Sequence, residues 1–282
     1  MNTLAMENRS ATTLLHSNPV LSRLSRVTER AEINDAATYS GIASKTGFFL
    51  LMTLAGIVLQ ILAQAIFAGD AVWQTFTVYD KFTVTLTKTE ALILTAVFAV
   101  GFIAELLGIF LRKTIPVTGT LYSVSQGYVI SFLVFDVLKG YEYLGLEALL
   151  LTVAVIAVMS RLYTSGRIRD GKKYRMVLLS LFLGSLGIAF FTGIGFVIPA
   201  TRPYAMALIQ NAALSVTLDV IGLVIAALFL ISDFSLIQTC VEQGYPREYE
   251  WSAAFGLVFT VLWVYLKILD LLMRFADKGK KN

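Results

Sequence analysis

Long apolar runs separated by short polar segments make up the chain from residue 46 onward. A helix needs about 20 apolar residues to cross the hydrocarbon core of a bilayer. Seven runs are candidate spans, at residues 46–68, 91–111, 119–138, 144–160, 176–198, 220–231 and 251–275, of which the run at 220–231 is the shortest. The pattern therefore predicts an all-α, polytopic integral membrane helix bundle with seven transmembrane helices, spanning residues 46–275.

Residues 69–88 follow a different pattern. Here β-branched and aromatic residues alternate with polar ones on both sides of Asp80-Lys81. This alternation is typical of two short strands joined by a turn. We expect a β-hairpin that forms an external loop between the first two spans.

The two ends of the chain are polar. Residues 1–45 contain no run long enough for a secretory signal. Leu21, Leu24 and Val27 recur at helical spacing with arginines between them, which fits an amphipathic helix on the membrane surface. An arm whose arginines only fix the topology is an equal alternative. Residues 276–282 form a basic tail.

Basic residues are distributed unequally between the two sides of the membrane. The N-terminal arm, residues 112–113, residues 161–175 and Arg247 would lie on the side that carries most of them. Because cytoplasmic loops are enriched in lysine and arginine, we predict a cell (inner or plasma) membrane protein with a cytoplasmic N-terminus and an external C-terminus. The basic tail is the one segment that points the other way.

The composition agrees with a membrane protein, since 57% of residues are hydrophobic and 15% are charged, against about 45–50% and about 25% in soluble domains. One cysteine and one histidine exclude an internal disulfide framework and a Cys/His metal centre. We expect no cofactor and no nucleic-acid partner. The chain has no phosphate loop and no nucleophile motif. We therefore expect it not to be an enzyme.

Ionisable groups within or beside the apolar runs are the candidate functional residues, because each costs a few kcal/mol in a bilayer. Two pairs share a helix face by spacing: Asp219 with Asp233, fourteen residues apart, and Lys267 with Asp270, three apart. We expect the second pair to interact directly. The predicted gating or ion-pathway residues are Glu105, Arg112, Asp219, Asp233, Lys267 and Asp270.

Each candidate also has a purely structural interpretation. Asp219 is better explained as an interfacial cap than as a transport residue. Arg112 could anchor the topology, and Glu105 could join two helices by a hydrogen bond. For Asp233 and Lys267 the functional interpretation is favoured, although a buried ion pair that fixes helix register is the alternative.

Short segments in the last two runs resemble a known family. Residues 231–237 read ISDFSLI, residues 253–256 read AAFG and residues 263–272 read WVYLKILDLL. These segments resemble the last two spans of the Bax inhibitor 1/YccA-like family. The arm sequence at residues 18–21 and Lys45-Thr46-Gly47 resemble a bacterial branch with an extended N-terminus. The resemblance implies a seven-span bundle in which the seventh helix is central.

The resemblance also implies two functions. Some members are pH-sensitive Ca²⁺ leak channels, in which two aspartates from spans six and seven share a proton and an arginine closing span two binds them. By position, Asp233 matches the first acid, Arg112 matches the arginine, and the second acid falls on Lys267. A lysine opposite Asp233 would keep the aspartate ionised, so Asp270 would have to replace the missing acid, or Lys267–Asp270 would act as a charge-inverted pair.

Two functional hypotheses follow. The first is a pH-sensitive Ca²⁺ or other cation leak channel, gated at this buried acidic and basic site. The second is a non-conducting regulator of a membrane-anchored protease or other membrane assembly, which would use the arm and the hairpin as contact surfaces. The expected partners are the lipid bilayer and either a cation or a membrane protease.

Overall fold

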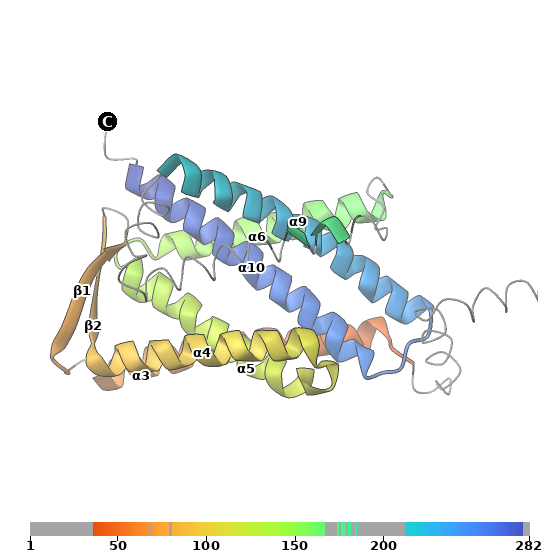
Figure 1. The fold of residues 1–282 in the computed structure, drawn as a ribbon, viewed down its shortest axis with the longest axis horizontal. Coiled ribbons are helices and arrows are strands. Elements are labelled where there is room, and N and C mark those ends of the chain that lie inside the picture. Colours follow the sequence, from red (N-terminus) through yellow and green to blue (C-terminus); the bar gives the residue numbers. More distant parts are fainter. Residues whose placement is uncertain are drawn as a thin grey trace, which may run out of the picture.

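The computed structural model describes residues 36–67, 69–78, 81–166 and 212–278, with isolated residues between 174 and 184. Over these residues the chain forms a bundle of long helices with a β-hairpin at one end (Figure 1). The predicted amphipathic arm, most of the predicted span at 176–198 and the end of the basic tail lie outside the described residues.

Five helices in the described part are long and apolar enough to cross a membrane. They are α3 (Tyr39–Phe67), α4 (Lys88–Phe110), α6 (Tyr143–Thr164), α9 (Ala212–Glu242) and α10 (Tyr249–Lys278). A further predicted span is formed by α5 (Ile115–Ser131) together with the π-helix η3 (Phe132–Val137). The all-α, polytopic membrane bundle is therefore confirmed.

The predicted hairpin is present. Strand β1 (Val72–Val78) pairs antiparallel with β2 (Phe82–Thr87), and Val78 lies opposite Phe82 across the turn. Every second residue of β2 is buried, at Phe82, Val84 and Leu86, because successive side chains point to opposite faces of a strand. The ring of Phe82 meets Tyr141 edge to face, with 5.7 Å between centroids, so the hairpin packs on the bundle.

Lys81, in the hairpin turn, joins the hairpin to the last helix. Its ammonium group donates a hydrogen bond to the Ala276 carbonyl at 2.9 Å. The same group lies 4.1 Å from the ring centroid of Tyr141, a favourable position for a cation–π interaction. The hairpin and the C-terminal end of α10 therefore lie at the same end of the bundle.

Helix α10 occupies the centre of the bundle. It packs against α9, α3, α6 and α5, and Figure 1 shows it crossing between α9 and the group formed by α3, α4 and α5. In an apolar stretch of 18 residues of α10, half of the residues are buried, whereas 17–33% are buried in the matching stretches of the other four candidate spans. The central position that the resemblance implied for the last helix is confirmed.

Helices α3 and α5 approach so closely that their backbones touch. A Cβ atom added to Gly127 would lie 2.8 Å from the Thr53 carbonyl carbon, and one added to Gly56 would lie 2.9 Å from the Tyr128 nitrogen. Small residues at such positions are typical of membrane helix pairs, which associate through close van der Waals packing.

Candidate functional site

Helices α9 and α10 pack antiparallel in a single register, which two glycines define. A Cβ atom added to Gly222 would lie 3.2 Å from Cε of Lys267, and one added to Gly256 would lie 3.2 Å from Oδ1 of Asp233. Eleven residues separate the two contact positions on each helix, so the register holds over about 16 Å of helix.

This register corrects the sequence-based position of Lys267. The resemblance had placed Lys267 against Asp233, but the structure pairs it with Asp219, at 2.9 Å between Nζ and Oδ1. The physical reason is the antiparallel packing. A residue late in α10 meets a residue early in α9, and Asp233 instead lies near the start of α10.

Four residues form what we call the α9–α10 charge cluster: Asp219, Lys267, Asp270 and Arg274. Asp219 is buried, at 6% exposure, and bridges to both bases. Its Oδ1 lies 2.9 Å from Lys267 Nζ, and its Oδ2 lies 2.9 Å from Arg274 Nε. Arg274 Nη2 also lies 3.5 Å from Asp270 Oδ2. The cluster therefore contains two acidic and two basic groups.

Two further expectations change at this cluster. Asp219 is not a helix cap as expected, since the residue lies seven positions inside α9 and is buried in ion pairs. The ion pair found at Asp270 is with Arg274, four residues later on the same face, whereas the sequence predicted a pair with Lys267. Sequence reasoning missed Arg274 because it lies where the apolar run ends. Its spacing of seven residues from Lys267 was the available signal.

The other three predicted residues lie outside this cluster. Asp233 is buried on α9, facing Gly256. Arg112 belongs to the short helix η2 (Arg112–Thr114), and its guanidinium lies 4.4 Å from the ring centroid of Tyr249 at the start of α10. Glu105 is half-buried on α4. The structure thus brings together Asp219, Lys267 and Asp270, and places Arg112 at the opposite end of α10.

A second buried ion pair joins the start of α3 to the start of α10. Glu250 has no exposed surface. It accepts hydrogen bonds from the backbone N–H of Thr38, at 2.9 Å, and from Lys45. Ala36 forms a β-bridge with Pro246 nearby. Glu250 immediately precedes the predicted span at residues 251–275, and its burial could not be recognised from the sequence.

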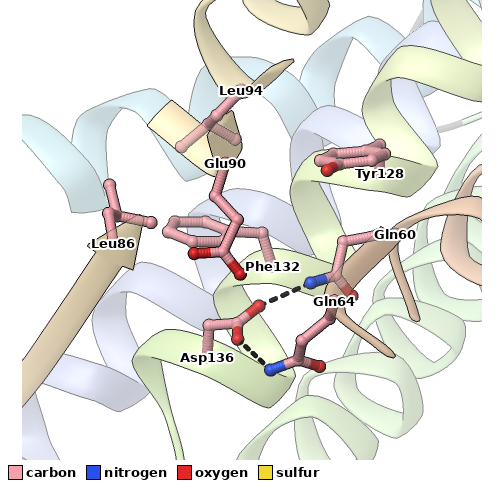
Figure 2. Close-up of a pocket in the computed structure, with 8 residues that line it drawn as sticks. All are labelled: Gln60, Gln64, Leu86, Glu90, Leu94, Tyr128, Phe132 and Asp136. Atoms are coloured by element: carbon pink, nitrogen blue, oxygen red, sulfur yellow. Dashed lines mark hydrogen bonds between the residues drawn. The ribbon is translucent and has the colours of Figure 1, made fainter. Parts of the chain in front are cut away.

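A third polar site, which we call the Asp136 pocket, lies at the hairpin end between α3, α4 and η3 (Figure 2). Gln60 and Gln64 both donate hydrogen bonds to the Asp136 carboxylate. Glu90 and Tyr128 contribute polar groups to the wall, and its apolar side chains are Leu86, Leu94 and Phe132. Sequence analysis missed this site, although Asp136 is an acid within an apolar run and Gln60 and Gln64 are spaced four apart.

No group of three or more His, Cys, Asp or Glu side chains could hold a metal ion in the part of the chain that the structure describes. The bundle, the hairpin and the buried ion pairs define a polytopic α-helical membrane protein with a charge cluster between its last two helices. The model of the family described as Bax inhibitor 1 like matches residues 18–277. Because this match covers nearly the whole sequence, the chain belongs to the Bax inhibitor 1 like family. Comparisons with curated proteins and with solved structures found no match.

Proposed function

We propose that this protein is a cation leak pathway, with Ca²⁺ as the expected ion, and that the α9–α10 charge cluster is its gate. The observation that carries the proposal is the burial of Asp219 with ion pairs of 2.9 Å to both Lys267 and Arg274. Charged groups inside a span are rare and usually mark ion or proton pathways. Membership of the Bax inhibitor 1 like family supports the same function.

Loss of the charge at position 219 is the proposed way to open the gate. In the observed arrangement both bases lie on α10, and Asp219 is the acid that holds them to α9. A neutral side chain at this position would lose its attraction for Lys267 and Arg274, which would then repel each other. The contact between α9 and α10 would weaken, and the pathway would open.

Ca²⁺ flux into dye-loaded proteoliposomes tests the proposal. Flux through the purified full-length chain should be low at pH 7.5, where the cluster is intact. Asp219→Asn removes the charge that holds the two bases to α9, so this variant should conduct several-fold more than the native chain at the same pH. Asp70→Asn, which changes an exposed carboxylate at the same end of the bundle, serves as the matched control. Absence of flux at every pH in both the native chain and Asp219→Asn would refute the proposal.

The charge balance of the cluster favours a second candidate function. Two bases neutralise two acids there, so a passing cation would find no net negative charge. A non-conducting regulator would satisfy this arrangement, and the hairpin offers exposed Val72 and Trp73 as a contact surface. Co-purification of a membrane protease with the native chain, lost in a Val72→Ser/Trp73→Ser variant, would support this function. Recovery of the same proteins by both chains would count against it.

A further inference from the structure

We propose that the Asp136 pocket binds a hard divalent cation. This site is separate from the α9–α10 charge cluster and does not depend on whether that cluster gates a leak. Four elements supply its polar groups: α3 through Gln60 and Gln64, α4 through Glu90, α5 through Tyr128, and η3 through Asp136.

Two carboxylates face the pocket from different elements. Figure 2 shows the carboxylate of Glu90 directed toward that of Asp136, with the two glutamine side chains on the other side. The charges of Glu90 and Asp136 repel each other, and the base that partly offsets them is Lys139, which is exposed in the turn after η3. Among the residues that the structure describes, no basic side chain lines the pocket. A cation placed between the two carboxylates would remove the repulsion.

The backbone at Asp136 is specialised. Residues Phe132–Val137 form a π-helix, and the Leu138 N–H donates to the Leu133 carbonyl, five residues earlier, at 3.0 Å. The wider turn directs Asp136 toward α3, where the side-chain amides of Gln60 and Gln64 donate hydrogen bonds to its carboxylate. Such π-turns cost stability and occur frequently at functional sites.

The available donors are oxygens. Glu90 and Asp136 provide carboxylates, and Tyr128 provides a hydroxyl at the wall. A half-turn of the Gln64 side-chain amide exchanges its N–H donor for a carbonyl acceptor. Gln60 stays in place, because its carbonyl oxygen already accepts a hydrogen bond from Ser131 at 2.7 Å. Carboxylate, carbonyl and water ligands suit Ca²⁺, Mg²⁺ and Mn²⁺.

The position of Glu90 is fixed independently of any ion. Its carboxylate accepts a hydrogen bond from the Thr87 N–H at 2.9 Å, and its own N–H donates to the Thr87 hydroxyl, completing a capping box at the start of α4. A cation held by Glu90 and Asp136 would therefore connect the hairpin and α4 to α5 and α3. Because only two of the ligands carry charge, we expect half-saturation at a Ca²⁺ concentration of about 0.1–1 mM.

Thermal unfolding of the purified full-length chain in detergent, titrated with CaCl₂ and with MgCl₂ at constant ionic strength, tests the proposal. About ten times the half-saturating concentration should raise the Tm by about 2–5 °C. Tyrosine-sensitised Tb³⁺ luminescence gives a second readout, since Tyr128 lies at the pocket and Ca²⁺ should compete with Tb³⁺. Comparison of the two salts identifies the preferred ion.

Glu90→Gln and Asp136→Asn should each remove the Ca²⁺-dependent shift or weaken half-saturation at least tenfold. Glutamine supports a capping box as glutamate does, so Glu90→Gln should keep the start of α4 intact. If Asp136→Asn does not fold, the effect of Glu90→Gln on Ca²⁺ binding alone tests the proposal. Asp70→Asn removes another carboxylate at the hairpin end and should bind as the native chain does. Absence of a saturable shift with either salt, or unchanged binding in both pocket variants, would overturn the proposal.

Discussion

At the scale of single residues, the most consequential contact is Asp219 between two bases. One carboxylate forms ion pairs of 2.9 Å with both Lys267 and Arg274, and its side chain is only 9% exposed. Removing one member of a buried ion pair is far more costly than removing the whole pair, because it leaves charge without compensation. Asp219 is therefore the position at which a small chemical change has the largest effect.

Asp219→Asn should lower the free energy of unfolding by about 2–4 kcal/mol, because Lys267 and Arg274 would lose their shared acid within the bundle. Unfolding in detergent, followed by circular dichroism, measures the change. Asp70→Asn should change it by less than about 0.5 kcal/mol, as most exposed substitutions do. Equal effects of the two substitutions would contradict the role assigned to Asp219.

The charged residues could be picked out from sequence, but their partners could not. Asp219, Asp233, Lys267 and Asp270 interrupt or adjoin apolar runs, which is a local signal. Which of them meet depends on the register of α9 against α10, and the sequence does not show where each helix begins or ends. Glu250 and Asp136 were missed for a related reason, since their hydrogen-bond partners lie far away in sequence, on or just before α3.

At the scale of elements, backbone atoms set the limit of the contact between α3 and α5. Gly127 and Gly56 each face backbone of the opposite helix, which cannot rotate away as a side chain can. The pair also positions Gln60 and Gln64 of α3 against Asp136, at the end of the same two helices.

Gly127→Ala should destabilise the protein by about 2–4 kcal/mol, because the added methyl group would force the two helices apart. Gly47→Ala is the matched control. It lies in α3 with nothing within 4 Å of the added atom, and alanine favours a helix over glycine by up to about 1 kcal/mol. The difference in Tm between the two variants is the measurement, and a Gly127→Ala protein as stable as Gly47→Ala would refute the close approach.

Lys81→Met should loosen the hairpin without unfolding the bundle, since it removes the hydrogen bond to Ala276 and the contact with Tyr141. Hydrogen exchange followed by mass spectrometry should show faster exchange over residues 72–87 and unchanged exchange in α3 and α5. The control is Lys88→Met, which changes an exposed lysine at the start of α4. Faster exchange throughout the protein would instead indicate a global role for Lys81.

At the scale of the whole molecule, the spans and the hairpin could be predicted because their signals are long or periodic. The membrane orientation is a prediction from the distribution of basic residues, and two contacts show which loops lie at the same end of the fold. The start of α3 is bridged to the α9–α10 turn at Pro246, and the hairpin is joined to the end of α10. Arg247 and Trp73 therefore lie at opposite ends of the bundle.

Labelling with a membrane-impermeant maleimide in intact cells tests this orientation. The single native cysteine, Cys240, is 1% exposed, so new cysteines should dominate the signal. Trp73→Cys should label from outside, and Arg247→Cys should label only after the membrane is permeabilised, because the basic loops are predicted to be cytoplasmic. The reverse pattern would invert the orientation, and labelling of both from one side would contradict the arrangement of the helices.

The glycines that set the register of α9 and α10 also restrict how the two helices can move. The methylene groups of Lys267 now pack against Gly222, which has no side chain. A slide by one turn, about 5.4 Å, would place Lys267 against the side chain of Leu218 or Ala226 instead. It would at the same time pull Asp219 away from both bases. Axial displacement is thus opposed by steric contact and by charge together. Tilting or separation of the two helices is the motion that remains, and it would widen the bundle at the hairpin end first if the turn at residues 243–248 acts as the pivot.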